Sequence, residues 1–179
     1  MRRGPLLLTI LLLAVAAAAT TIIPMSVERL AAQSSHVVYA RALEHHSAWN
    51  TDHTRIFTYT QFEVMQSLKG NAPATILVKQ LGGHAGGYNM KVAGVRYWQN
   101  GEDAVLFLQP TTPSDGTYRV TGLMQGDFRI AQSQSGKVVV SNGVPEAKEV
   151  SGSGEVQAYR GSQMTLRELE ARVRQAVGQ

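Results

Sequence analysis

Hydrophobic and polar residues alternate along much of the middle of the chain, which is the pattern of half-buried β-strands. The longest example covers residues 55–68, RIFTYTQFEVMQSL. Successive side chains of a strand point to opposite faces. One face is therefore expected to carry Ile56, Thr58, Thr60, Phe62, Val64 and Leu68. The continuous apolar run at 104–108, AVLFL, lies between turn signals and predicts a strand that is buried on both faces.

Further strands are expected where β-forming residues lie between turn signals. They cover residues 36–43, 75–81, 117–123, 128–131 and 137–141. The polar segment 45–53 is interpreted as a hairpin loop. The glycine-rich segment 82–87, GGHAGG, is interpreted as a sharp reversal before a short alternating run at 88–95. This series predicts a mainly β fold, a small barrel or sandwich, over residues 25–141.

Helical spacing occurs only near the two ends of this domain. Residues 26–32 begin with a capping serine and predict a short N-terminal helix. At the C-terminus Thr165 and Glu168 match a capping box, and apolar residues recur at helical spacing behind them. We expect an amphipathic helix over residues 165–178 that packs on the barrel. Residues 142–164, which are rich in Gly, Ser and Glu, are expected to form a loop or linker.

Residues 1–19 have the layout of a secretory signal peptide. Arg2 and Arg3 precede an apolar core at 6–15, and small residues offer a cleavage site after Ala19. An uncleaved membrane anchor is the alternative, because residues 6–23 approach the roughly 20 apolar residues that span a bilayer. We expect a periplasmic or secreted protein that meets the membrane only transiently, through its signal peptide.

Charge and cysteine content narrow the possible functions. The chain has 17 basic and 13 acidic residues, and setting aside Arg2 and Arg3 of the leader leaves 15 against 13. This balance does not predict a nucleic-acid partner. The chain has no cysteine, which excludes disulfides, thiolate metal sites and cysteine nucleophiles.

Several motifs, taken in order, resemble those of an uncharacterised family of exported bacterial proteins. They are HVVYARAL, VMQSLKG, VKQLGG, GEDAVLFL, YRVTGLMQGDFRI and MTLRELEARVRQAV. The same order is similar, more distantly, to the netrin-like domain of the tissue inhibitors of metalloproteinases. That resemblance implies a small OB-type barrel of five strands. Those inhibitors chelate the protease's metal with an N-terminal cysteine, so a chain without cysteine cannot inhibit in that way.

An aromatic group beside the glycine-rich loop is a candidate binding site. Tyr88, Tyr97 and Trp98 flank the loop, and His84 lies within it. Exposed aromatic side chains are enriched at recognition surfaces, which favours a binding patch. The alternative is that Tyr97 and Trp98 close one end of the barrel core.

A second candidate is a metal site. His45, His46 and His53 lie in the predicted hairpin loop, and a barrel can bring the glycine-rich loop with His84 close to them. Convergent neutral imidazoles bind zinc or copper. Their spacing matches no zinc signature, and solvated loop histidines are the alternative. No other cofactor is expected.

No catalytic residues are assigned. The chain has no G-x-S-x-G elbow, and its scattered carboxylates do not suggest a glycosidase pair. We therefore predict an exported, non-catalytic binding or interaction module with a protein or small-molecule partner. Two alternatives stay open: a metal-binding protein or metal-dependent enzyme that uses the loop histidines, and a structural component of the cell envelope.

Overall fold

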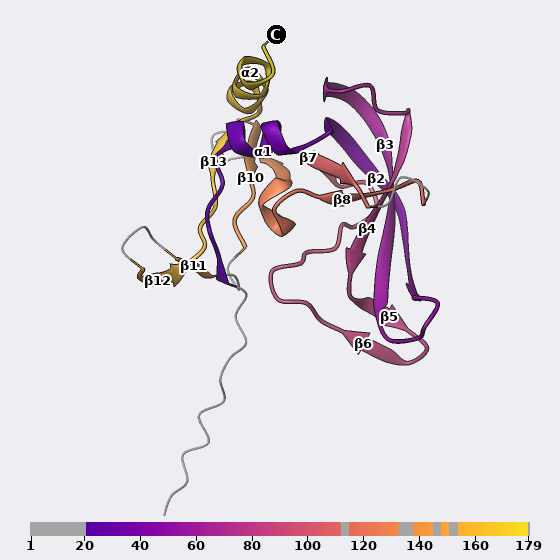
Figure 1. Ribbon diagram of the computed structural model, residues 1–179. Helices are drawn as coiled ribbons and strands as arrows, with labels where there is room; N and C mark the ends of the chain where they lie inside the picture. The colour runs from indigo at the N-terminus through magenta and orange to yellow at the C-terminus, as the bar shows by residue number, and fades with distance from the viewer. Residues whose placement is uncertain (1–20, 112–114, 133–137, 145–147, 151–153, 179) are drawn as a thin grey trace, which may run out of the picture.

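A computed structural model describes residues 21–111, 115–132, 138–144, 148–150 and 154–178 (Figure 1). The predicted signal peptide lies outside these residues. The elements follow in the order β1 (Thr21–Ile22), α1 (Val27–Gln33), β2 (His36–Trp49), β3 (Ile56–Lys69), β4 (Thr75–Leu81), β5 (Gly83–Ala85), β6 (Tyr88–Met90), β7 (Asp103–Pro110), β8 (Thr117–Val120), the 3-10 helix η1 (Leu123–Gly126), β9 (Asp127–Gln132), β10 (Val138–Ser141), β11 (Lys148–Val150), β12 (Val156–Ala158), β13 (Gln163–Thr165) and α2 (Leu166–Ala176).

Five strands close into a ring in the order β2, β3, β4, β8 and β7. Neighbouring strands are antiparallel except β4 and β8, which run parallel. β9, β10 and β13 extend the same sheet outward from β7. The predicted mainly β fold is thus confirmed.

Strand β7 separates the two main parts of the core. Ala104, Leu106 and Leu108 face the interior of the ring. Val105 and Phe107 face the opposite way and pack with residues of both helices. All five side chains are completely buried, so the prediction of a strand buried on both faces is confirmed. The Val, Leu and Phe side chains among them each contribute about 1.5–3 kcal/mol of burial free energy, which makes β7 the central strand of the fold.

The β2–β3 hairpin is longer than predicted. β2 continues to Trp49, and its residues pair with β3 as far as Ile56. The interpretation of residues 45–53 as a loop is therefore wrong for 45–49. These polar residues fit a strand because this end of the hairpin extends beyond the core, where His45 and His46 are exposed.

The glycine-rich segment forms the β5–β6 hairpin, which confirms the predicted reversal. Gly83 has φ +128°, and a Cβ atom there would lie 2.3 Å from Thr58 Oγ1. A side chain at this position would collide with β3, so only glycine allows the close approach. The alternating run predicted over 88–95 ends early, because only Tyr88–Met90 is a strand.

The predicted loop or linker at 142–164 is wrong in part. β11 and β12 form a small sheet with β1, and β13 pairs with β10. Val144 and Tyr159 are buried with Ile22 and Met124 in a small core of their own. This core collects residues from distant segments, so no local periodicity in 142–164 reveals it.

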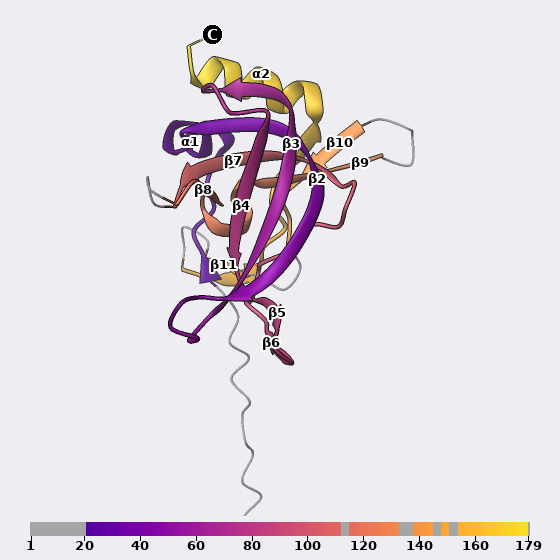
Figure 2. The same cartoon turned by 90° about the vertical axis from the view of Figure 1, so that its right-hand side faces the viewer.

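Both helices lie at one end of the molecule, and the β5–β6 hairpin lies at the other (Figure 2). Their caps are as predicted: Ser26 Oγ accepts a hydrogen bond from the Arg29 N–H, and Thr165 Oγ1 accepts one from the Glu168 N–H. Leu169 and Val173 of α2 are buried against the sheet and α1. Within the described residues, no helix has the length and apolar character needed to cross a membrane.

An ion pair between α1 and α2 makes stability depend on pH. Arg172 Nε lies 2.7 Å from Glu28 Oε1, and this hydrogen bond lowers the pKa of Glu28 from 4.5 to about 2. Because the folded-state pKa is lowered, the pair stabilises the fold above pH 4.5, and this contribution disappears as the pH falls towards 2.

We expect Glu28→Gln to lower the free energy of unfolding at pH 7 by about 0.2–1 kcal/mol, the range for exposed pairs. The difference from the wild-type protein should shrink as the pH falls below 4.5. Urea titrations at several pH values measure this, and Glu44→Gln on exposed β2 is the control. A constant difference across that pH range would contradict the assignment.

Candidate functional site

A pocket of about 440 Å³ lies where β4 and β8 part. We call it the β4–β8 pocket. Its apolar lining consists of Leu81, Val92, Val95, Val120, Leu123 and Met124. Its polar lining consists of Gln33, Lys79, Gln80, Arg96, Gln109, Arg119, Thr121 and Asp127. Ligand sites usually combine apolar lining with placed polar groups, and this pocket offers both.

The pocket results from the short pairing of its two strands. β8 pairs with β4 only at Leu77–Thr117 and Val78–Tyr118. β4 then continues to Leu81, while β8 continues to Val120 along β7. The chain next turns through η1 and returns to the same edge of β7 as β9. The pocket fills the space between the parting strands, η1 and the irregular segment at 92–96.

A buried ion network forms one wall of the pocket. Asp127, completely enclosed at the start of β9, accepts hydrogen bonds from Arg129 Nε at 2.9 Å and Trp98 Nε1 at 3.1 Å. Arg96 Nη2 lies 3.8 Å from the same carboxylate. Arg129 also pairs with Glu102. Burial raises the pKa of Asp127, whereas the neighbouring cations and the indole N–H act in the opposite direction.

The cations that line the pocket differ in how they are compensated. Arg96 faces Asp127, and the Lys79 ammonium lies 3.7 Å from Asp115 Oδ2 and 4.7 Å from the Phe57 ring centroid. Arg119 is exposed and donates to the neutral Gln109 Oε1 at 3.0 Å. In the described part of the chain, no carboxylate forms an ion pair with Arg119. Among the described residues, Arg119 is therefore the pocket cation that has no acidic partner.

A second, wider hollow of about 1000 Å³ lies on the other side of Arg96. Its acidic groups already have partners. Asp103 accepts from Arg41 Nε at 2.7 Å and from Tyr39 Oη at 2.9 Å, and Glu102 pairs with Arg129. The hydrogen bonds from Arg41 and Tyr39 lower the pKa of Asp103, so both carboxylates of this hollow are already engaged within the fold. The β4–β8 pocket is therefore the better candidate.

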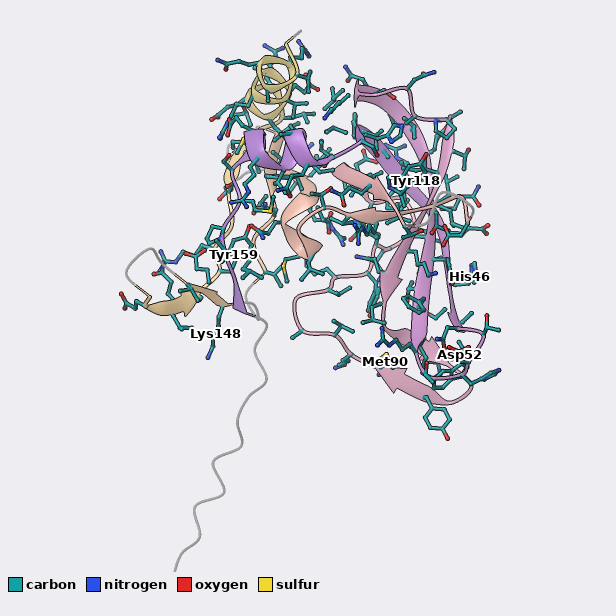
Figure 3. The ribbon with its side chains drawn as sticks, viewed as in Figure 1. His46, Asp52, Met90, Tyr118, Lys148 and Tyr159 are labelled. Atoms are coloured by element: carbon teal, nitrogen blue, oxygen red, sulfur yellow. The ribbon has the colours of Figure 1, made fainter. Side chains whose placement is uncertain are left out.

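Tyr88 lies in an exposed aromatic group, but not the one that the sequence suggested. Its side chain is 67% exposed, and its ring centroid lies 5.5 Å from that of Trp49. The ring of His53 stacks on Trp49 at 6.1 Å. These residues join the tips of the β2–β3 and β5–β6 hairpins, in the region where Figure 3 labels Asp52 and Met90.

Trp98 is not part of an exposed patch, which corrects the prediction for this residue. Its side chain is completely buried in the ring, and its ring contacts Phe62 edge-on with centroids 5.0 Å apart. Tyr97 is half-buried and donates its hydroxyl to Leu81 O at 2.9 Å, and burial raises its pKa. The alternative interpretation placed both residues at one end of the barrel core, and the structure places Trp98 in the core and Tyr97 at its half-buried border.

The structure does not bring the four candidate metal ligands together. His45 and His46 are neighbours on β2 and therefore point to opposite faces. His46 stacks on Tyr59, while His53 lies in the turn and His84 is exposed on β5. Within the described residues, no group of three or more His, Asp or Glu side chains is arranged to hold a metal ion. The hypothesis of a histidine metal site therefore finds no geometric support.

The residues that build the β4–β8 pocket were not singled out from the sequence as a site. Lys79, Arg96 and Arg119 belong to three segments that meet only when the ring closes. The alternation of Asp127 and Arg129 around the buried Phe128 was a local signal of a charged pair on one strand face.

Comparison with known proteins adds no relative to this description. Neither a scan of protein-family models nor a search of the curated proteins finds a match for the chain. The resemblances to exported bacterial proteins and to netrin-like domains remain predictions from the motifs.

Proposed function

We propose that the protein is a non-catalytic binding module whose β4–β8 pocket takes a ligand with an apolar body and an anionic group. The observation that carries this proposal is Arg119, which has no acidic partner among the described residues and borders a pocket with six apolar side chains. Apolar surface supplies affinity, and a charged group at the edge orients the ligand.

The other reactive groups of the pocket are engaged in the fold, which favours binding over catalysis. The Asp127 carboxylate is held by Arg129 and Trp98. The Thr121 hydroxyl lies 2.8 Å from Ser34 Oγ, in a buried hydrogen bond. Groups fixed in this way stabilise the wall of a site and are poorly placed to exchange protons with a ligand.

We also propose that the ring is an OB-type barrel and that the protein is exported to the periplasm or secreted. The support for the barrel is the closed set of five strands with one parallel pair. The support for export is the leader pattern at residues 1–19.

An amphipathic anion tests the binding proposal. We expect 8-anilinonaphthalene-1-sulfonate to bind the folded protein with increased fluorescence, because its rings match the apolar lining and its sulfonate matches Arg119. Arg119→Glu should weaken this binding at least about tenfold, since it replaces a charge-assisted contact by repulsion. Fluorescence titration gives both dissociation constants.

Arg167→Glu is the matched control, because it makes the same charge change at an exposed position of α2, a helix that contributes no residue to the pocket. It should leave the dissociation constant unchanged. A second variant, Val95→Phe, fills the pocket without altering charge and should also weaken binding. Equal binding by the wild-type protein and both pocket variants, with unchanged circular dichroism, would refute the proposal.

A further inference from the structure

The tips of the β2–β3 and β5–β6 hairpins project together from the end of the molecule opposite the helices (Figure 2). Trp49 is the last residue of β2, and Tyr88 is the first residue of β6. Their ring centroids lie 5.5 Å apart, and the His53 ring stacks on Trp49 at 6.1 Å. Gly86 lies against the same indole, because a Cβ atom there would be 3.2 Å from Trp49 Nε1. We call Trp49, His53 and Tyr88 the tip surface.

The rings of the tip surface are available for contact outside the molecule. Tyr88 is 67% exposed, His53 is exposed and Trp49 is half-buried. None of the three belongs to the clusters of buried side chains found among the described residues. Trp and Tyr combine an apolar ring with one polar atom, and they are enriched where lipid meets water. The residue types of the tip surface therefore match the headgroup layer of a membrane.

The backbone of the β2–β3 turn is hydrogen-bonded within the turn itself. Asn50 Oδ1 accepts from the N–H groups of Thr54 and Arg55, each at 2.9 Å. The Asn50 N–H donates to Arg55 O at 2.8 Å. Backbone groups that already have partners lose less on leaving water than unpaired groups do. The turn can therefore enter a headgroup layer at a low desolvation cost.

The charge of the two tips favours an anionic surface. The charged residues of segments 49–56 and 83–91 are Asp52, Arg55 and Lys91, two cations against one carboxylate. All three are exposed, and within the part of the chain that the structure describes none of them forms an ion pair. Lys and Arg side chains close to a membrane are attracted by anionic lipids.

The beginning of the described chain lies in the same half of the molecule as the tips. β1, the indigo strand of Figure 1, and its partner β11 lie away from the helices and towards the hairpin tips in both views (Figures 1 and 2). The leader pattern at residues 1–19 directly precedes β1. A leader that is held in a membrane during export therefore connects to the half of the molecule that carries the tip surface.

We infer that the tip surface docks on a membrane that contains anionic phospholipid. Trp49 and Tyr88 lie at the level of the headgroups, and Arg55 and Lys91 contact lipid phosphates. Two narrow tips can enter a fluid headgroup layer, whereas a protein partner needs a hollow of matching shape. This inference goes beyond the proposed function and does not depend on the β4–β8 pocket.

Quenching of Trp49 fluorescence tests whether the tip surface meets the lipid. The probe is a vesicle of equal parts phosphatidylcholine and phosphatidylglycerol whose acyl chains are brominated near the headgroup. The chain has two tryptophans, and Trp98 is completely buried. We expect these vesicles to quench part of the emission of the full chain purified after export, and to leave the emission of Trp49→Phe unchanged. No quenching of the wild-type chain would overturn the inference and assign the tip surface to a protein partner.

Charge variants test the anionic character of the membrane, with binding measured by vesicle flotation. Arg55→Glu and Lys91→Glu should each weaken binding at least about tenfold, and vesicles of phosphatidylcholine alone should bind the wild-type chain more weakly by a similar factor. Arg167→Glu on α2, at the opposite end, is the matched control and should bind as the wild-type chain does. The leader, cleaved or kept, is the same in all variants, and circular dichroism checks that each one folds. Equal binding of all variants, or equal binding to both kinds of vesicle, would overturn the inference.

Discussion

Replacing Asp127 with alanine is expected to lower the free energy of unfolding by about 3–5 kcal/mol. The Asp127 carboxylate is completely enclosed and compensates Arg129 at 2.9 Å and Arg96 at 3.8 Å. Alanine would remove the carboxylate that lies between these two guanidinium groups in a largely buried site and leave Arg129 with Glu102 as its remaining ion pair. The Trp98 N–H would lose its acceptor. The cost of removing one member of a buried ion pair is large because the remaining charge is not rehydrated.

Urea unfolding followed by circular dichroism measures this loss. We expect a lower midpoint at an unchanged denaturant dependence. Asp52→Ala in the exposed turn between β2 and β3 is the control and should change stability by less than about 0.5 kcal/mol. Asp127→Asn retains an oxygen acceptor for the indole but no charge, so its cost should be intermediate. A loss below about 1 kcal/mol for Asp127→Ala would show that the two arginines do not depend on this carboxylate.

Replacing Trp98 with alanine should be as damaging, at about 3–5 kcal/mol. Trp98 is completely buried, packs edge-on against Phe62, and lies with its ring centroid 5.0 Å from the Arg129 guanidinium carbon. Its removal leaves a cavity in the ring and takes one hydrogen-bond donor from the Asp127 carboxylate. Tyr88→Ala, at a side chain that is 67% exposed, should cost less than about 0.5 kcal/mol.

Thermal unfolding of Trp98→Ala and Tyr88→Ala, measured in parallel, compares the stability lost at a core side chain with that lost at a surface side chain. Trp98→Phe keeps most of the ring volume and removes the N–H, so it isolates the hydrogen bond to Asp127, worth about 1–3 kcal/mol. Similar stability losses for Trp98→Ala and Tyr88→Ala would contradict the buried position of Trp98.

The elements that the sequence predicted well are those whose pattern is local. The run at 104–108 predicts a buried strand without further information, because every position is apolar and turn signals limit it on both sides. The two helices likewise carry their caps and apolar spacing within a few residues, as Ser26 and Thr165 show.

The positions that could not be predicted depend on distant contacts. Trp98 lies in an irregular segment, where no regular spacing of apolar and polar residues predicts the direction of a side chain. The polar residues 45–49 extend a strand because residues 56–60 pair with them. The β4–β8 pocket exists because β4 and β8 pair at residues 77–78 and 117–118 in the closed ring and then part. Only the order of the strands in space determines these contacts.

The parallel pairing of β4 with β8 also has a consequence for the order in which the chain folds. Strands β2, β3 and β4 are consecutive neighbours and can form a meander as soon as residue 81 is available. The ring cannot close before β8 is complete at Val120. Until then Phe62 and Val78, which the closed ring buries completely, have no strand opposite them. A folding chain therefore passes through a stage with an exposed apolar sheet, and a chaperone that binds such surfaces has its target until β8 closes the ring.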